Sequence, residues 1–136
     1  MSEKKVRRKN NCHIDVYNFH NTNAHINIGN NTLIGNNSII YGTGGVTIGN
    51  DVITAPLLKI VTQNHNYRGE SLIREQGITT KPVTIEDNVW IGINVTILPG
   101  VTIGTGSIIG ANALLTKNVP PNTIIIGTNQ TLKKRQ

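Results

Sequence analysis

The sequence has little of what stabilises an ordinary globular or secreted domain. Cys12 is the only cysteine among the 136 residues, so no internal disulfide can form. Aromatic residues make up 4% of the chain, which argues against a large mixed core. No apolar run approaches the roughly 20 residues that a membrane-spanning helix needs. Because no apolar stretch follows the basic start, that start is unlike a secretory signal. We therefore expect a cytoplasmic protein without a membrane span.

Positive charge is concentrated at the two ends of the chain. The net charge is +6, yet residues 10–132 carry five cations and six anions. We therefore expect one folded domain over residues 10–128, between a basic N-terminal tail (1–9) and a basic C-terminal tail (129–136). Basic ends can bind nucleic acid, but charge alone is weak support for that role. We predict no nucleic-acid partner.

A six-residue repeat organises most of the remaining sequence. Six consecutive hexads begin with an aliphatic residue, at positions 85, 91, 97, 103, 109 and 115. The fifth position of each hexad is small or β-branched, and Gly, Asn, Asp, Thr and Pro are common in between. An earlier block has the same pattern at Ile28, Ile34 and Ile40, and it resumes two residues out of phase at Ile48.

The spacing of the hexads predicts short parallel strands. Positions five and one lie two residues apart across each junction, as in Val101 and Ile103, which is the period of a strand with one buried face. Gly or Asn then turns a corner, so three hexads close a triangular coil. Stacked coils pair in parallel at about 4.8 Å and share one core. We predict an all-β parallel β-helix of about five coils, with one long loop inserted at 64–82. An irregular β-sandwich is the alternative, and six uninterrupted hexads argue against it.

Three segments of the C-terminal half resemble the maltose, galactoside and capsular sugar O-acetyltransferases, within the left-handed β-helix acyltransferases. They read VTIEDNVWIG from Val83, ILPGVTIG from Ile97 and TKNVPPN from Thr116. The resemblance covers roughly residues 26–127. It implies a left-handed β-helix, a homotrimer with active sites between subunits, a sugar or glycan acceptor, and acetyl-coenzyme A as the co-substrate.

The resemblance also assigns roles to individual residues. It places the catalytic base at His65 and matches residues 66–82 to a loop that reaches toward the neighbouring subunit. The positions that it assigns to the coenzyme A site are Trp90, Ile93, Ala111, Thr116, Lys117 and Lys134. The acceptor-binding Asn and Asp of the galactoside enzymes correspond to Gly35 and Thr43 here, so the acceptor is not identified.

The chemistry of acetyl transfer is compatible with these residues. A hydroxyl must lose its proton as it attacks the thioester, and histidine accepts protons near neutral pH. Neither a cysteine nucleophile nor a metal ion is required. A lone loop histidine is more often only solvated, and we interpret His13, His20 and His25 of the degenerate first coil as structural or exposed. Lys117 would contact phosphate as a point charge. Trp90 should face outward, under the loop or at a subunit interface.

Three other functions share this fold. An N-acetyltransferase acting on an often nucleotide-linked amino sugar would acetylate amines and no hydroxyl. A γ-type carbonic anhydrase would need three histidines converging on zinc, and His65 has no histidine partner in the C-terminal half. A non-catalytic scaffold would present a ladder of threonines. Thr47, Thr84 and Thr102 occupy equivalent outward positions, but other residue types interrupt them.

Overall fold

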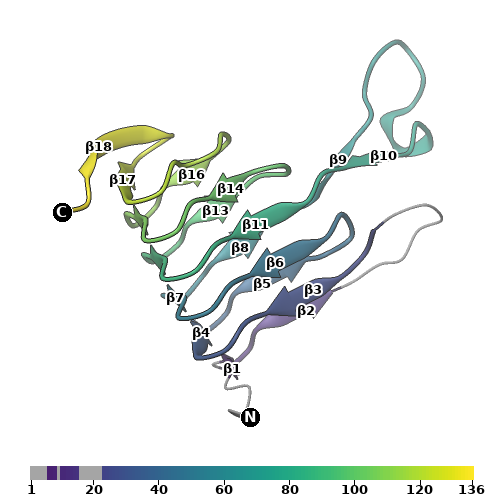
Figure 1. Ribbon diagram of the computed structural model, residues 1–136. Coiled ribbons are helices and arrows are strands. Elements are labelled where there is room, and N and C mark those ends of the chain that lie inside the picture. Colours follow the sequence, from purple (N-terminus) through teal and green to yellow (C-terminus); the bar gives the residue numbers. More distant parts are fainter. Residues whose placement is uncertain (1–5, 9, 16–22) are drawn as a thin grey trace.

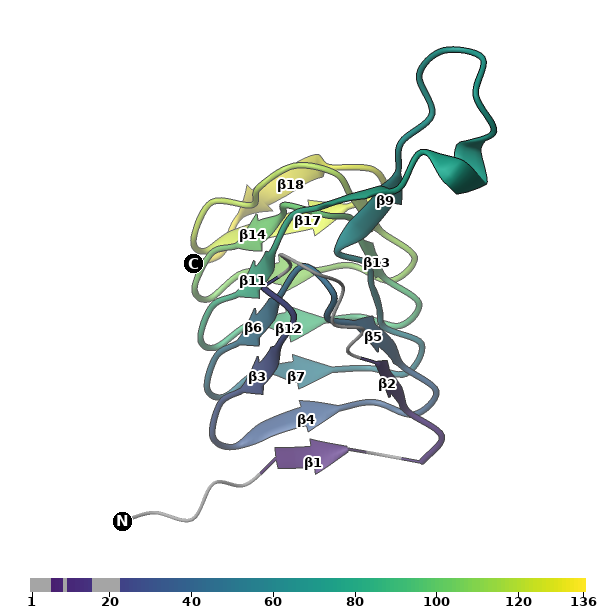
Figure 2. The same ribbon diagram turned by 90° about the vertical axis from the view of Figure 1, so that its right-hand side faces the viewer.

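The computed structural model describes residues 6–8, 10–15 and 23–136. Within them the chain winds into a stack of coils, and the strands on each of its three sides form a sheet (Figures 1 and 2). We name these sheets A, B and C. Sheet A contains β1 (Val6–Arg8), β4 (Thr32–Ile34), β7 (Ile53–Thr54), β12 (Trp90–Ile91), β15 (Ile108–Ile109), β17 (Thr123–Ile126) and β18 (Gln130–Lys134). All of its neighbours pair in parallel except β17 and β18, which are antiparallel.

The other two sheets complete each coil. Sheet B contains β2 (His13–Asp15), β5 (Ile39–Tyr41), β8 (Lys59–Ile60), β13 (Thr96–Ile97) and β16 (Leu114–Leu115). Sheet C contains β3 (Ile26–Ile28), β6 (Val46–Ile48), β11 (Val83–Ile85) and β14 (Thr102–Ile103). The chain passes from A to B to C and back to A, so three corners run the length of the stack. We call them the A–B, B–C and C–A corners. The expectation of an all-β fold with parallel strands is confirmed.

The core is a column of aliphatic side chains inside the stack. Every hexad that begins between 85 and 115 places its first residue inside with at most 1% of its surface exposed: Ile85, Ile91, Ile97, Ile103, Ile109 and Leu115. A few buried positions carry hydroxyls instead, and most of these form hydrogen bonds nearby. Ser107 donates to the carbonyl of Pro120 at 2.9 Å and accepts from the amide of Thr123 at 3.2 Å.

The corners depend on residues that tolerate positive φ. At the C–A corner these are Asn31, Asp51, Asn88, Gly106 and Asn122. At the A–B corner they are Asn37, Leu57, Asn94, Asn112 and Gly127. Asn, Asp and Gly enter this backbone region at low cost, which explains their abundance in the sequence. Leu57, with a φ of 67°, is the exception.

A hairpin leaves the stack where the hexads are interrupted. It consists of β9 (Gln63–His65) and β10 (Ile78–Thr80), with a 3-10 turn at η1 (Ile73–Glu75), and it projects from the B–C corner (Figure 2). We expected a loop over 64–82, and the structure pairs both of its ends as antiparallel strands. The hairpin tip contains three exposed apolar side chains: Tyr67, Leu72 and Ile73.

Both chain ends contain more structure than the tails we expected. Within the expected N-terminal tail, Val6–Arg8 pairs with β4. Within the expected C-terminal tail, Gln130–Lys134 folds back as β18 against β17. The last parallel strand of a stack leaves a row of unpaired amides and carbonyls, and a returning strand satisfies them. In the described part of the chain, no helix is long and apolar enough to cross a bilayer.

Candidate functional site

His65 lies at the foot of the projecting hairpin. It is the last residue of β9, pairs across the hairpin with Ile78, and is exposed. Asn66 stabilises the turn that follows, because its Nδ2 donates to the carbonyl of Gln76 at 3.1 Å and its Oδ1 accepts from the Thr79 hydroxyl at 2.7 Å. His65 is therefore exposed to solvent at the base of a hairpin that hydrogen bonds stabilise, and it lies outside the stacked core.

Trp90 lies on the outer face of sheet A and not under the hairpin of its own chain. It is in register with Ile53 on one side and Ile108 on the other, and 55% of its surface is exposed. Leu33 and Ile124 extend the same outward row. The corresponding outward row of sheet C is polar: Asn27, Thr47, Thr84 and Thr102. Sheet A therefore presents a more apolar outer face than sheet C, and Trp90 is uncovered in a single copy of the chain.

A groove follows this apolar face. One part, of about 270 Å³, is lined by Ile53, Trp90, Ile108 and the polar residues Asp51, Asn88 and Arg135. A second part, of about 590 Å³, shares Asp51, Ile53 and Asn88 and continues to Arg7. The polar lining residues are not among the site residues expected from the sequence. Asp51 and Asn88 are of the residue types that are common at every corner of the stack, so nothing in the sequence distinguishes them. Arg135 lines the groove only because β18 folds back.

Ile93 and Ala111 lie above one another at the A–B corner. The amide of Asn112 donates to the carbonyl of Ile93 at 2.8 Å, which stacks the two turns directly. Ile93 is 45% exposed and Ala111 is also exposed. Together they form a narrow apolar ridge that a flexible chain can follow.

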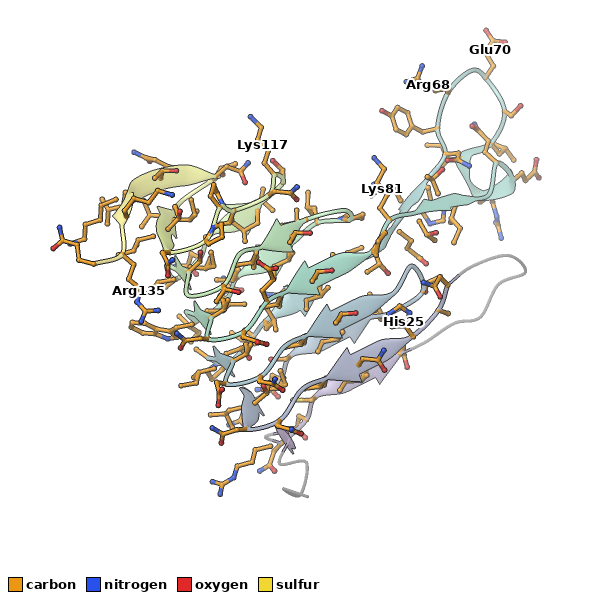
Figure 3. The ribbon with its side chains drawn as sticks, viewed as in Figure 1. His25, Arg68, Glu70, Lys81, Lys117 and Arg135 are labelled. Carbon is orange, nitrogen blue, oxygen red and sulfur yellow. The ribbon has the colours of Figure 1, made fainter. Side chains whose placement is uncertain are left out.

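Thr116 and Lys117 lie at the B–C corner near the C-terminal end of the stack. Their amides both donate to the Oδ1 of Asn129, at 2.9 and 3.3 Å. The side chain of Asn129, which precedes β18, therefore holds this turn in place. Figure 3 shows Lys117 and Lys81 on the side from which the hairpin leaves, and Arg135 on the opposite side. No carboxylate in the described part of the chain pairs with Lys81 or Lys117. Lys81 was not predicted as a site residue; its position at the foot of the hairpin adds a second free cation to this edge.

Lys134 lies elsewhere. It is in β18, opposite Thr123, and its Nζ donates to the Thr123 hydroxyl at 3.0 Å. This places Lys134 beside the C–A corner, whereas Lys117 is at the B–C corner. A single copy of the chain therefore separates residues that the resemblance assigns to one site: His65 and Lys117 are at one corner, Ile93 and Ala111 at another, and Trp90 on sheet A.

The two positions that bind the acceptor in galactoside acetyltransferases cannot do so here in the same way. A Cβ at Gly35 would lie 2.3 Å from the carbonyl carbon of Ala55, so no side chain fits there. Thr43 is fully buried, and its hydroxyl has no hydrogen-bond partner. In the described residues, no three His, Cys, Asp or Glu side chains lie close enough together to hold a metal ion.

Two family models match this chain. Residues 82–117 match the bacterial transferase hexapeptide model, and residues 25–55 match the hexapeptide repeat of succinyl-transferase. The crystal structure of a maltose O-acetyltransferase from Clostridium difficile 630 superposes with a TM-score of 0.82 at 33% identity, covering 98% of this chain and 68% of that one. The chain belongs to the hexapeptide-repeat transferase family.

Two further members of this hexapeptide-repeat family are similar over most of the chain. The galactoside O-acetyltransferase of Escherichia coli (strain K12) is 41% identical over 105 residues, which are 76% of this chain and 51% of that protein. A hexapeptide-repeat acetyltransferase from Vibrio cholerae O1 biovar eltor, solved with acetyl-coenzyme A, has a TM-score of 0.81 at 33% identity and covers 98% of this chain and 69% of its own. The chain spans about half the length of the curated relatives it matches. These neighbours imply that the β-helix is left-handed.

Proposed function

We propose that this hexapeptide-repeat protein transfers an acetyl group from acetyl-coenzyme A to a hydroxyl of a sugar or glycan, in a site formed between subunits of a homotrimer. The observation that carries the proposal is the separation of His65 from Trp90, Ile93 and Ala111 in one copy. Because the hairpin projects away from its own stack, His65 can approach these three residues only in a neighbouring copy of the chain. The prediction of a cytoplasmic location is part of the same proposal.

In this proposal His65 acts as the general base. A ring nitrogen of His65 takes the proton of the acceptor hydroxyl as its oxygen attacks the thioester carbonyl. The new C–O bond forms, the C–S bond breaks, and the proton passes from the imidazolium to the departing thiolate. The products are an acetyl ester and free coenzyme A, and His65 returns to its neutral form.

The residues of the A–B corner suit the pantetheine arm of acetyl-coenzyme A, and those of the B–C corner suit its phosphates. The exposed apolar ridge of Ile93 and Ala111 offers a surface for the pantetheine arm, while Lys81, Lys117 and Thr116 offer donors for phosphate oxygens. Lys134 is already bonded to Thr123 and would reach a phosphate with the donors that this bond leaves free.

The assembly that we propose also explains the exposed apolar surfaces. The row containing Ile53 and Trp90, and the hairpin tip with Tyr67, Leu72 and Ile73, are both exposed in one copy. Apolar patches of this kind usually mark contacts between proteins. A closed three-fold ring would cover both without leaving an open end.

An acetyl-transfer screen tests the activity. Purified protein is incubated with acetyl-coenzyme A and a panel of sugars, glycan fragments and nucleotide-linked amino sugars, and free thiol and product are measured together. We expect a product whose acetyl group is released by mild base, as an ester is. A base-stable amide, formed only with amino sugars, would instead support the N-acetyltransferase alternative. Failure of the protein to bind coenzyme A would support a non-catalytic scaffold.

A further inference from the structure

The corner at Pro56–Leu57 differs from every other turn of the A–B corner. Leu57 has a φ of 67°, while the stacked positions are Asn37 (57°), Asn94 (59°), Asn112 (62°) and Gly127 (57°). A leucine in this region pays a steric cost that asparagine largely avoids. Strain of this kind persists when the surrounding structure imposes it, and it is concentrated at functional sites.

The strained corner is firmly held. The Leu57 amide donates to the carbonyl of Asn36 at 2.9 Å, and its carbonyl accepts from the Nζ of Lys59 at 3.3 Å. The same Lys59 nitrogen also donates to the Oδ1 of Asn94 in the next coil. The backbone at Leu57 is therefore held by hydrogen bonds at both its amide and its carbonyl.

Pro56 extends the apolar ridge by one coil, and Leu57 lies next to it in the same turn. The amide of Asn94 donates to the carbonyl of Pro56 at 3.0 Å, so the 56–57 turn lies directly against the turn that contains Ile93. The apolar residues thus run from Ala111 through Ile93 to Pro56 and Leu57. The ridge ends there, because Asn36 and Asn37 occupy the next turn. A row of stacked apolar residues offers a surface along which a thin, partly apolar chain can lie.

The height of His65 indicates which part of that chain reaches Leu57. The hairpin leaves the stack directly after β8, in the same coil as Pro56 and Leu57. A three-fold axis parallel to the stack moves a residue to the neighbouring copy without changing its height. The His65 of a neighbour is therefore level with Leu57, one coil away from Ile93 and two from Ala111. The reacting carbonyl has to lie beside this histidine.

We propose that Pro56 and Leu57 form the wall against which the acyl group of the donor rests, and that Leu57 limits its length to acetyl. The strained conformation directs a branched apolar side chain to a corner where an asparagine would leave a polar surface. The proposal rests on the proposed acetyl transfer and adds a determinant of donor selectivity to it.

The test compares three substitutions at Leu57 with one control. Leu57→Gly removes the wall and suits the positive φ, so the ratio of kcat/KM for butyryl-coenzyme A to that for acetyl-coenzyme A should rise at least about tenfold, since burying two methylene groups is worth roughly that factor. Leu57→Met keeps an apolar wall and should retain the wild-type ratio. Leu57→Asn should raise the unfolding midpoint by about 2 to 4 °C through relief of strain. Asn37→Leu, which repeats the strained turn one coil away, should lower the midpoint and leave the ratio unchanged.

Free coenzyme A separates this inference from the proposed function. It lacks the acyl group, so its affinity measured by calorimetry should be the same for wild type and Leu57→Gly. A wild-type protein that binds neither coenzyme A nor acetyl-coenzyme A would refute the proposed function itself. Normal binding together with an unchanged donor ratio in Leu57→Gly would overturn the role of Leu57 alone. The role of Leu57 would also be overturned if Leu57→Gly lost as much affinity for free coenzyme A as for acetyl-coenzyme A, since Leu57 would then contact the pantetheine arm.

Discussion

The ammonium group of Lys134 donates a 3.0 Å hydrogen bond to the hydroxyl of Thr123, which is 1% exposed at the end of sheet A. This bond ties the last strand, β18, to the strand that it covers. The neighbouring Arg135 adds a second tie, because its Nη1 donates to the carbonyl of Gly106 at 2.8 Å. The basic C-terminus thus closes one end of the stack as well as contributing charge.

Loss of this bond should reduce stability. Lys134→Met keeps the aliphatic stem but removes the donor, and we expect the free energy of unfolding to fall by about 1 kcal/mol, the usual net worth of such a hydrogen bond. Urea unfolding followed by circular dichroism measures the change. Lys133→Met is the matched control, because Lys133 lies opposite Ile124 on the outer face and donates no hydrogen bond to the described residues. Equal stability of the two variants would show that the Lys134 bond contributes nothing.

Charge on the apolar face should prevent self-association. Ile53→Asp places a carboxylate in the middle of the exposed row on sheet A, where a subunit contact would have to desolvate it. Wild-type protein should have a mass in solution near three times the 14.8 kDa of one chain, and the variant should approach a single chain. Light scattering coupled to gel filtration gives both masses. Asn27→Asp, at the equivalent outward position of polar sheet C, should leave the mass unchanged. A wild-type mass near that of one chain would refute the trimer.

The two free cations of the B–C corner should strengthen donor binding. Lys117→Ala is expected to weaken acetyl-coenzyme A binding by about fivefold at low ionic strength and by less at high salt, since salt screens exposed charges. Lys81→Ala should act in the same direction. Coenzyme A without its 3′-phosphate identifies the contact by calorimetry: if Lys117 binds that phosphate, the variant and wild type should bind the shortened ligand equally. Unchanged affinity for both ligands would remove Lys117 from the site.

Removal of the base should slow the reaction without disturbing the fold. His65→Ala is expected to reduce turnover by about 10²- to 10⁴-fold, the usual contribution of a positioned general base. The unfolding midpoint and the mass should stay as in wild type, because His65 lies outside the stacked core. The wild-type kcat/KM should rise with pH and then level off, because a protonated imidazole cannot act as a base. This rise should be absent in the variant.

A second histidine provides the comparison for that experiment. His13 is exposed on sheet B, where its Nε2 is 2.5 Å from the Oδ2 of Asp15, and His13→Ala should retain the wild-type rate and pH profile. If instead His65→Ala keeps full activity with the same rise, the base has to be sought among the histidines of the first coil. His20 of that group lies outside the described residues.

The sequence by itself determined the repeating architecture. The hexads predicted the inward residue of each strand, because the side chains of a strand alternate between its two faces and Gly, Asn or Asp marks the corner that follows. Ile91, Ile97 and Ile103 are buried as that pattern requires. The interruption after residue 63 was also visible, since the aliphatic period stops there. These features depend on neighbours within a few residues, and local spacing contains that information.

Only the tertiary structure decided how the candidate site is distributed. No local pattern shows that residues 130–134 pair with β17, since this pairing satisfies the open edge of a sheet that forms only when the coils stack. The assignment of Trp90, Ile93 and Lys117 to a face and two different corners likewise follows from how the three sheets close. Leu57 is the clearest case. Its sequence context is that of an ordinary apolar corner, whereas its left-handed backbone depends on a coil-to-coil contact: the Leu57 amide donates to the carbonyl of Asn36, which only the stacking of the coils brings into reach.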